Sequence, residues 1–169
     1  HLDRAIEFNS HQEVIAVEPS TNMFNFLKNK YGEDSRVDLH NYLLWSSSGQ
    51  NIRFNDDAQH QGLAASVHQH EEFGDDSYVE TITIDDLVGD NYVSQIALDV
   101  EGSEQHAIVG AKNTIQRSSP VCAVCLYHNL DDYVRLPGLV KSLTGSRKLA
   151  VRQHSCIPFI ENVLYAYDQ

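Results

Sequence analysis

The chain has 169 residues, of which 41% are hydrophobic and 21% are charged, as in an ordinary globular protein large enough for one domain with a buried core. Its formal net charge of -12 argues against binding a nucleic-acid backbone or an anionic membrane surface, because both need clustered Lys and Arg. No apolar run approaches the roughly 20 residues that span a bilayer. We therefore predict a soluble protein with no nucleic-acid and no membrane partner.

The three cysteines, Cys122, Cys125 and Cys156, do not have the spacing of a disulfide framework. An odd count of this kind favours a reducing compartment, so we predict a cytoplasmic location. Cys122 and Cys125 lie in an apolar run that predicts a buried strand, where residues three apart point to opposite faces. We interpret both as small core residues rather than as a metal or disulfide pair.

The first part of the chain predicts a strand followed by a helix. Residues 2–8 have the spacing of a helix, and the apolar run 14–17 predicts a strand buried on both faces. Glu18 and Pro19 follow this strand. A helix is then expected from Thr21 to Gly32, and its inward residues are Met23, Phe26, Leu27 and Tyr31. A carboxylate such as Glu18, at the end of a strand in a nucleotide-type fold, can accept hydrogen bonds from both ribose hydroxyls. The alternative is that it only solvates the strand end.

The middle of the chain alternates short strands with polar sequence. A strand with its exit loop is predicted at 37–45, and further strands at 51–54 and 78–84. Either Asp85 or Asp86 is expected to cap the turn after the last of them. Residues 55–77 have little periodicity and predict a long loop over one end of the sheet, as a lid or substrate loop. The histidines of this loop, His60, His68 and His70, are interpreted as exposed rather than metal-binding.

The stretch QIALDVEGSEQHAIVGA, from residue 95 to 111, has the pattern of a strand, an acidic turn and a helix. Its apolar run 96–98 predicts a buried parallel strand, and Ser103 is a plausible N-cap with Glu101 and Glu104 at the positive end of the helix dipole. One apolar helix face is predicted from Ala107, Ile108, Ala111 and Ile115. In open α/β sheets, ligands bind beyond the carboxyl ends of the strands, so Asp99 and Glu101 are candidate functional residues. They could also merely solvate the turn.

The last part of the chain completes an α/β pattern. A buried strand is predicted at 121–127, ending in His128 and Asn129, and a helix at 134–143. Two final strands, at 147–153 and 159–167, have few residues between them and should pair antiparallel. Alternating strands and helices predict a mainly parallel sheet, and a terminal hairpin after such a sheet is typical of the class I methyltransferase fold.

Five stretches in order resemble one family. They read VIAVEPSTNMFNFLKNKY, VETITIDDLV, QIALDVEGSEQHAIVGAKNTIQRSSPV, LYHNLDDYVRLPGLV, and RKLAVRQHS with VLYA. Through these five stretches, which run from about residue 14 to the end, the chain resembles the FkbM-type S-adenosylmethionine-dependent methyltransferases. The resemblance implies an α/β class I methyltransferase (Rossmann-like) sheet with a C-terminal antiparallel hairpin, in a single domain over residues 1–169. The strand and glycine-rich loop that open the family's sheet do not precede EVIAVEPS, so we expect the domain to be incomplete at its N-terminus.

The resemblance also implies site residues. For the cofactor S-adenosylmethionine, Glu18 would bind the ribose, Pro19 and Ser20 would shape the turn, and Asn41 and Tyr42 would lie near the adenine. Asp99, Glu101 and His128 would form the catalytic site.

The implied reaction is O-methylation of a hydroxyl on a small molecule or sugar. Methyl transfer from a sulfonium is an in-line displacement, so the enzyme positions the acceptor and removes its proton. His128 or Asp99 could be the base, and His has the better intrinsic pKa for neutral pH. A divalent ion on Asp99 and Glu101 is another way to acidify a hydroxyl. Because the sequence lacks a firm third ligand, we predict no metal. His128 could equally be a structural histidine at a strand end.

Two alternatives belong to other classes of protein. A non-catalytic domain could keep the methyltransferase fold for binding or assembly. Two observations favour this alternative: the glycine-rich loop is lacking, and Ala97 stands where the family commonly has Lys. The retained Glu18 and Asp99 oppose it. A nicotinamide-dependent oxidoreductase is disfavoured, since the chain has no GxGxxG and its closing hairpin fits the methyltransferase topology.

Overall fold

The chain folds into a mixed α/β structure with several sheets, and the computed structural model describes residues 6, 13–54, 77–145, 147–156 and 161–168. The contacts divide it into two compact units. One consists of His1–Leu43 with Asn51–Thr81, and the other of Leu44–Gln50 with Ile82–Gln169. The single domain over residues 1–169 stays a prediction. The predicted helix at 2–8 apart from Ile6, and the predicted loop at 55–77 apart from Ser77, lie outside the described residues.

The first unit contains the predicted strand–helix–strand sequence. Strand β1 (Val14–Val17) runs parallel to β2 (Val37–His40), with helix α2 (Thr21–Tyr31) between them in sequence. Ser20 caps α2, because its Oγ accepts a hydrogen bond from Met23 N at 3.1 Å. Gly32 follows the last helical residue and donates to Lys28 O at 2.9 Å. Both boundaries of the helix agree with the sequence prediction.

Two burial predictions in this unit were wrong. All four residues of β1 are part-buried or exposed, and Ile15 is 40% exposed. Among the described strands β1 pairs only with β2. In α2, Met23 and Phe26 are exposed, while Phe24, Leu27 and Tyr31 are part-buried. The inward face is therefore rotated away from the predicted one.

The other short strands form a three-stranded sheet of order β3-β5-β4. Its strands are β3 (Leu43–Leu44), β4 (Asn51–Phe54) and β5 (Ser77–Ile82), and β4 pairs antiparallel with β5. The segment 37–45, predicted as one strand with its exit loop, thus contains β2 and the short strand β3. The predicted strand at 78–84 ends two residues earlier.

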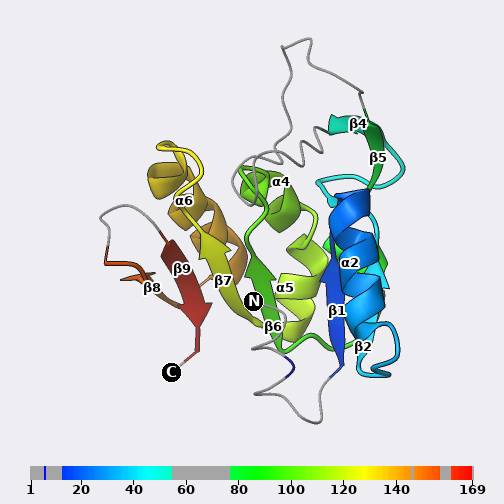
Figure 1. The fold of residues 1–169 in the computed structure, drawn as a ribbon. Coiled ribbons are helices and arrows are strands. Elements are labelled where there is room, and N and C mark those ends of the chain that lie inside the picture. Colours follow the sequence, from blue (N-terminus) through cyan, green and yellow to red (C-terminus); the bar gives the residue numbers. More distant parts are fainter. Residues whose placement is uncertain (1–5, 7–12, 55–76, 146, 157–160, 169) are drawn as a thin grey trace. The chain divides into compact units, whose positions relative to one another are not determined.

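The second unit is built on a four-stranded sheet of order β6-β7-β9-β8. Strand β6 (Gln95–Leu98) is parallel to β7 (Val121–Cys125). Strand β9 (Asn162–Tyr167) is antiparallel both to β7 and to β8 (Lys148–Gln153), and lies between them (Figure 1). This confirms the predicted antiparallel pairing of the last two strands.

The helices of this unit are α3 (Ile84–Val88), α4 (Glu104–Val109), α5 (Lys112–Ser118) and α6 (Asp132–Thr144). Helix α6 begins two residues before the predicted start and continues through Pro137. None of the helices in the described ranges is both long enough and apolar enough to cross a membrane.

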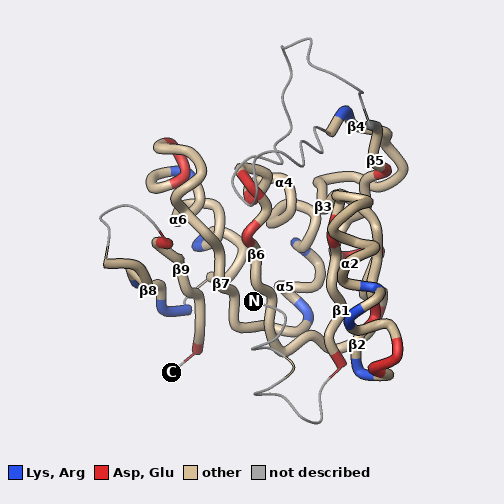
Figure 2. The backbone as a smooth tube through the Cα atoms, in the orientation of Figure 1, with Lys and Arg blue, Asp and Glu red and all other residues tan. Residues whose placement is uncertain are grey.

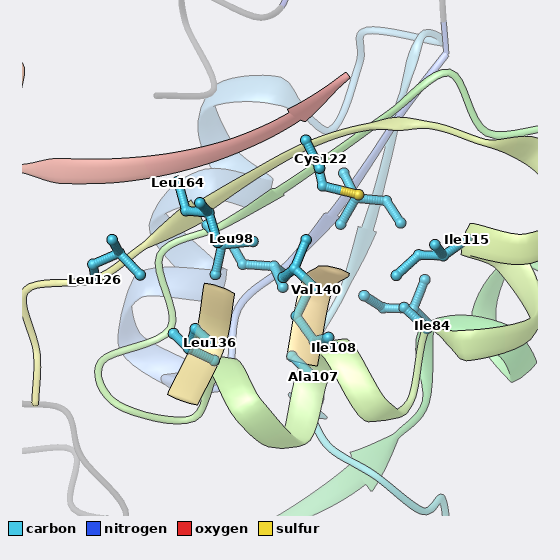
Figure 3. Packing of buried hydrophobic residues seen from close by; sticks show 14 of the residues in the cluster. Ile84, Leu98, Ala107, Ile108, Ile115, Cys122, Leu126, Leu136, Val140 and Leu164 are labelled. Atoms are coloured by element: carbon cyan, nitrogen blue, oxygen red, sulfur yellow. The ribbon is translucent and has the colours of Figure 1, made fainter. Parts of the chain in front are cut away.

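A hydrophobic core fills the second unit, where side chains from α4, α5 and α6 meet those of the sheet (Figure 3). The predicted inward face is confirmed, since Ala107, Ile108 and Ala111 are 0% exposed and Ile115 is 2% exposed. Cys122 and Cys125 are buried and free, as predicted for core residues. In β6, however, Ile96 and Leu98 are buried while Ala97 is exposed, so only one face of this strand is covered. The prediction of coverage on both faces was wrong.

Asp85 and Asp86 do not cap the turn after β5. Thr83 is the N-cap of α3, and its Oγ1 accepts a hydrogen bond from Asp86 N at 2.9 Å. The carboxylate of Asp85 instead accepts from the first turn of α5, from Thr114 N at 2.7 Å and Asn113 N at 3.0 Å. The start of α5 is therefore capped from another helix, which sequence spacing alone does not reveal.

Candidate active site

The loop after β6 has an unusual backbone. Glu101 has a φ of 50° and Gly102 a φ of 94°, so two successive residues are in the left-handed region. A Cβ on Gly102 would also lie 3.0 Å from Nδ2 of Asn129. This turn therefore needs glycine at 102, and it holds a non-glycine residue, Glu101, in a conformation that costs energy. Acidic residues gather at the end of β6 and the start of α4 (Figure 2).

His128, which follows β7, lies among the carboxylates of this loop. Its Nε2 is 3.4 Å from Oδ1 of Asp99 and 3.3 Å from Oε2 of Glu101. Its side chain is 9% exposed. The structure thus brings together the three residues named as catalytic from the sequence, because β6 and β7 are adjacent parallel strands that end on the same side. Their catalytic roles stay predictions.

Glu104 belongs to the same cluster, and the sequence analysis missed its part in it. Its side chain is 0% exposed, and its Oε1 accepts a hydrogen bond from Val100 N at 3.1 Å. The same oxygen lies 2.7 Å from Nδ1 of His128. A signal was present in the sequence, since Glu104 precedes Ala107, Ile108 and Ala111 by three, four and seven residues. A carboxylate on the buried stripe of a helix needs a partner.

Tyr127 is a second residue that the sequence analysis did not name. Its hydroxyl donates to Oδ1 of Asp99 at 2.8 Å, and its ring lies 4.3 Å from that of His128, centroid to centroid. Burial and the bond to Asp99 raise the pKa of Tyr127 above its usual range. The phenol thus donates its proton to Asp99 and helps to orient that carboxylate.

The crowding of acidic groups shifts the pKa values of the cluster. Burial alone would lower the pKa of His128, but the hydrogen bond to Glu104 and the charges of Glu104, Glu101 and Asp99 outweigh it, so the net shift is upward. Burial raises the pKa of Glu101. The charge of His128 lowers this pKa, while the charges of Asp99 and Glu104 raise it further, so the net shift is upward. The cluster thus favours positive charge on the imidazole.

A pocket of about 500 Å³ opens beside His128. It is lined by residues of the loop after β6, of α4, and of the β7–α6 connection with the start of α6, among them Gly102, Gln105, Asn129, Asp132 and Arg135. Nδ2 of Asn129 donates to Oδ2 of Asp132 at 3.1 Å, and Arg135 pairs with Asp131 at 3.2 Å. The lining is mostly polar, so the pocket suits a ligand with several hydrogen-bonding groups.

One group of possible metal ligands occurs among the described residues. Asp99, Glu104 and His128 each offer an atom, and these atoms lie within 4.8 Å of one another. His128 and Glu104 are close because Nδ1 of His128 contacts Oε1 of Glu104 at 2.7 Å. We assign no ion to this group, and the absence of a metal stays a prediction.

The residues predicted to bind the methyl donor lie in the first unit, at the ends of β1 and β2. Oε1 of Glu18 accepts a hydrogen bond from Ser20 N at 2.8 Å. Asn41 donates through Nδ2 to Glu18 O at 2.7 Å and to Pro19 O at 3.1 Å. Tyr42 lies close to these residues in sequence, with its ring 6.4 Å from that of His40. The structure thus joins Glu18, Pro19, Ser20 and Asn41 in one hydrogen-bonded turn, and donor binding by them stays a prediction.

The family model described as Methyltransferase FkbM domain matches residues 3–137, which is most of the chain. The chain therefore belongs to the FkbM methyltransferase domain family, and the resemblance seen in the sequence is confirmed.

A solved structure is also similar to this chain. It is the crystal structure of Methyltransferase FkbM from Methylobacillus flagellatus KT, with 22% sequence identity and a TM-score of 0.73. The match covers 98% of this chain but 40% of the other, so this chain spans less than half the length of that protein. At this identity the likeness shows the fold alone. Comparison with curated proteins gave no match.

Proposed function

We propose that the protein is an S-adenosylmethionine-dependent methyltransferase that acts on a hydroxyl of a small molecule or sugar. The observation that carries the proposal is the placement of His128 between Asp99 and Glu101, beside a polar pocket, in a chain of the FkbM family. We infer a Rossmann-like class I methyltransferase fold, and the parallel pair β6–β7 with the antiparallel strand β9 beside β7 supports it. The net charge of -12 supports the proposal that neither nucleic acid nor a membrane is a partner. The odd number of cysteines supports the proposed cytoplasmic location.

The turn after β1 fits the ribose of the donor. Ser20 N–H holds one carboxylate oxygen of Glu18, and Asn41 holds the backbone of the same turn, so the carboxylate is pre-oriented. An ionised carboxylate only accepts hydrogen bonds, which suits a vicinal diol. S-adenosylmethionine, when bound, supplies a methyl group activated on a sulfonium. The protein then has to position the donor and the acceptor, since methyl transfer is an in-line displacement.

The acceptor hydroxyl has to lose its proton as the methyl group is transferred. Nε2 of His128 and the carboxylate of Asp99 are the candidate bases, and they lie 3.4 Å apart. The pocket beside His128 would hold the acceptor, and its Asn129 and Asp132 side chains offer hydrogen bonds to further hydroxyls.

Binding of S-adenosylmethionine to the intact protein, measured by isothermal titration calorimetry, tests this proposal. We expect saturable binding of the unmodified chain. Glu18→Ala should weaken it by about 1–3 kcal/mol, because the ribose hydroxyls lose their acceptor. Glu33→Ala is the matched control, since Glu33 is an exposed carboxylate of the same unit.

Absence of binding by the unmodified protein would contradict the enzyme assignment. It would favour the alternative of a domain that keeps the fold for binding or assembly. Equal binding by the unmodified chain and Glu18→Ala would instead remove Glu18 from the donor site.

A further inference from the structure

We propose that Asp99, Glu101 and His128 form the binding site of one divalent cation, next to the pocket of the proposed methyltransferase. The sequence predicts no metal, because a firm third ligand is lacking beside the two carboxylates. The structure supplies a candidate for that ligand, since Nε2 of His128 lies between them. The use of the ion in catalysis rests on the proposed function, whereas its binding can be measured without donor or acceptor.

The ring of His128 is aimed into this cluster with one nitrogen left over. The side chain is 9% exposed, and Nε2 is buried without a hydrogen-bond partner among the described residues. It lies 3.4 Å from Oδ1 of Asp99 and 3.3 Å from Oε2 of Glu101, and both distances exceed the usual length of an N–H···O hydrogen bond. Neither carboxylate therefore satisfies Nε2. An ion is one of the partners that explain a buried polar atom of this kind.

The spacing of the three atoms suits a common ion. Ligands that lie about 2.0–2.2 Å from one metal ion are about 3.0–3.4 Å from each other at octahedral and tetrahedral angles. Both distances from Nε2 agree with this spacing. The side chains of Asp99 and Glu101 are 30% and 32% exposed, so they can turn toward the ion and give it a path to the buried nitrogen.

Two further residues hold the proposed ligands in place. Oε1 of Glu104 lies 2.7 Å from Nδ1 of His128, and the hydroxyl of Tyr127 donates to Oδ1 of Asp99 at 2.8 Å. A carboxylate on the second ring nitrogen is the usual outer partner of a metal-bound histidine, and carboxylate ligands are themselves hydrogen-bonded. Because Nδ1 and Nε2 point away from each other, Glu104 orients the ring and does not bind the ion on Nε2.

The charges of the cluster also favour a cation. The carboxylates of Asp99, Glu101 and Glu104 all act on one imidazole, which can carry a single positive charge. The excess negative charge is partly buried, where it is costly unless it is compensated. One imidazole nitrogen with two carboxylates is a suitable set of ligands for a divalent first-row metal such as Mn²⁺ or Zn²⁺.

The proposed methyl transfer balances with this site. The ion binds the acceptor oxygen in the pocket that His128 lines, and thereby acidifies the hydroxyl. The O–H bond breaks and its proton passes to water. The oxygen forms a bond to the methyl carbon while the S–CH₃ bond breaks, and that electron pair stays on sulfur. His128 and Asp99 are then ligands and not the base.

Titration of the chelator-treated intact protein with Mn²⁺, followed by electron paramagnetic resonance, tests the site. The signal of free Mn²⁺ counts the bound ions, and electron spin echo modulation by ¹⁴N shows whether an imidazole is a ligand. We expect one bound Mn²⁺ per chain with imidazole modulation. Calorimetry with Zn²⁺ tests the second ion. If the unmodified protein binds neither Mn²⁺ nor Zn²⁺, the proposal is overturned and the absence of a metal stands.

Variants separate the ligands from the outer partner. Asp99→Asn and His128→Gln should abolish measurable Mn²⁺ binding, and circular dichroism shows whether they are folded. Glu104→Gln should weaken binding by roughly 10–100-fold and keep the imidazole modulation, as expected for an outer partner. The matched control is His40→Gln, because His40 also pairs with a carboxylate, Asp38, at 2.9 Å. This control should bind Mn²⁺ like the unmodified protein.

A different location of the ion has a distinct signature. His68 and His70 lie outside the described residues and are followed by two glutamates. Unchanged Mn²⁺ binding by folded Asp99→Asn and His128→Gln, together with loss of binding in His68→Gln or His70→Gln, would overturn the proposal.

Donor binding distinguishes this inference from the proposed function. If Mn²⁺ binds at the cluster and S-adenosylmethionine does not bind, the proposed function fails and the cation site stands. If S-adenosylmethionine binds and no ion does, only the cation site fails. Once a hydroxyl acceptor is found, a chelator should abolish methyl transfer and Mn²⁺ should restore it. Transfer that continues at full rate without the ion would overturn its catalytic use.

Discussion

A buried carboxylate and a buried imidazole form the centre of the candidate site. Oε2 of Glu104 has no hydrogen-bond partner among the residues that the structure describes, and the same is true of Nε2 of His128. Buried polar atoms without a hydrogen-bond partner cost free energy of folding. Such atoms are often found at functional sites. Glu101, with its positive φ, adds a third local cost within the same few residues. At the residue scale, this concentration of unfavourable features indicates a functional site.

The three thiols of the chain should differ widely in reactivity. Burial raises the pKa of Cys122 to about 11 and also raises that of Cys125, whereas Cys156 is exposed. Thiolate is the reactive form of cysteine. We therefore expect a disulfide reagent at about pH 8 to modify Cys156 quickly in the native protein and all three thiols after denaturation.

A Cys156→Ser variant is the control for this measurement. It should have no fast phase before denaturation. Rapid modification of two or three thiols in the native protein would show that the strand carrying Cys122 and Cys125 is not buried as described.

At the scale of elements, the junction of α4 and α5 organises the second unit. Gly110 separates the two helices, and a Cβ there would overlap the backbone carbonyl of Trp45. Gly110 O also accepts a hydrogen bond from Asp85 N at 2.9 Å, and the carboxylate of Asp85 caps α5. The break therefore has an identifiable cause in the close approach of two backbone segments and in a cap supplied by α3.

Gly110→Ala should destabilise the protein by about 1–3 kcal/mol, because the backbone of Trp45 has to move. The matched control is Gly138→Ala, in helix α6, where a Cβ would have no atom within 4 Å. That change should be neutral or stabilise by about 0.5–1 kcal/mol, since alanine is the better helix former. Chemical denaturation of both variants measures the difference in the free energy of unfolding. Equal effects of the two substitutions would contradict the proposed cause of the helix break.

At the scale of the whole molecule, burial is unevenly distributed. The hydrophobic cluster that includes Ile108, Val124, Leu136 and Leu164 lies entirely in the second unit. In the first unit, α2 has no buried residue and β1 is only part-buried. The candidate base and the pocket are thus built on the better packed unit, which suits a site that must hold its geometry.

Native-state hydrogen exchange should report this difference. We expect the amides of β7 and β9 to exchange slowly, near the limit of global unfolding, and those of β1 and β2 to exchange faster through local opening. Rates corrected for the intrinsic exchange of each residue are the measurement. Equal protection of β1 and β7 would contradict the unequal packing.

Much of the fold followed from local patterns. The apolar runs predicted β1, β6 and β7, and the short connection between the last two strands predicted their antiparallel pairing. Helical spacing predicted the buried face of α4 and α5, because the side chains of one helix repeat every 3.6 residues whatever lies opposite. Met23 and Phe26 show the limit of such patterns, since two overlapping sets of apolar residues were available in α2 and packing selected the other.

The sequence by itself determined the family, the positions of most strands and helices, and the candidates Asp99, Glu101 and His128 near strand ends. Only the tertiary structure decided that Glu104 pairs with His128, 24 residues away, and that Asp85 caps α5 instead of the turn beside it. The physical reason is that periodicity and capping motifs act over a few residues. The partner of a buried charge depends instead on which strands and helices lie side by side, and that is set by the packing of the whole unit.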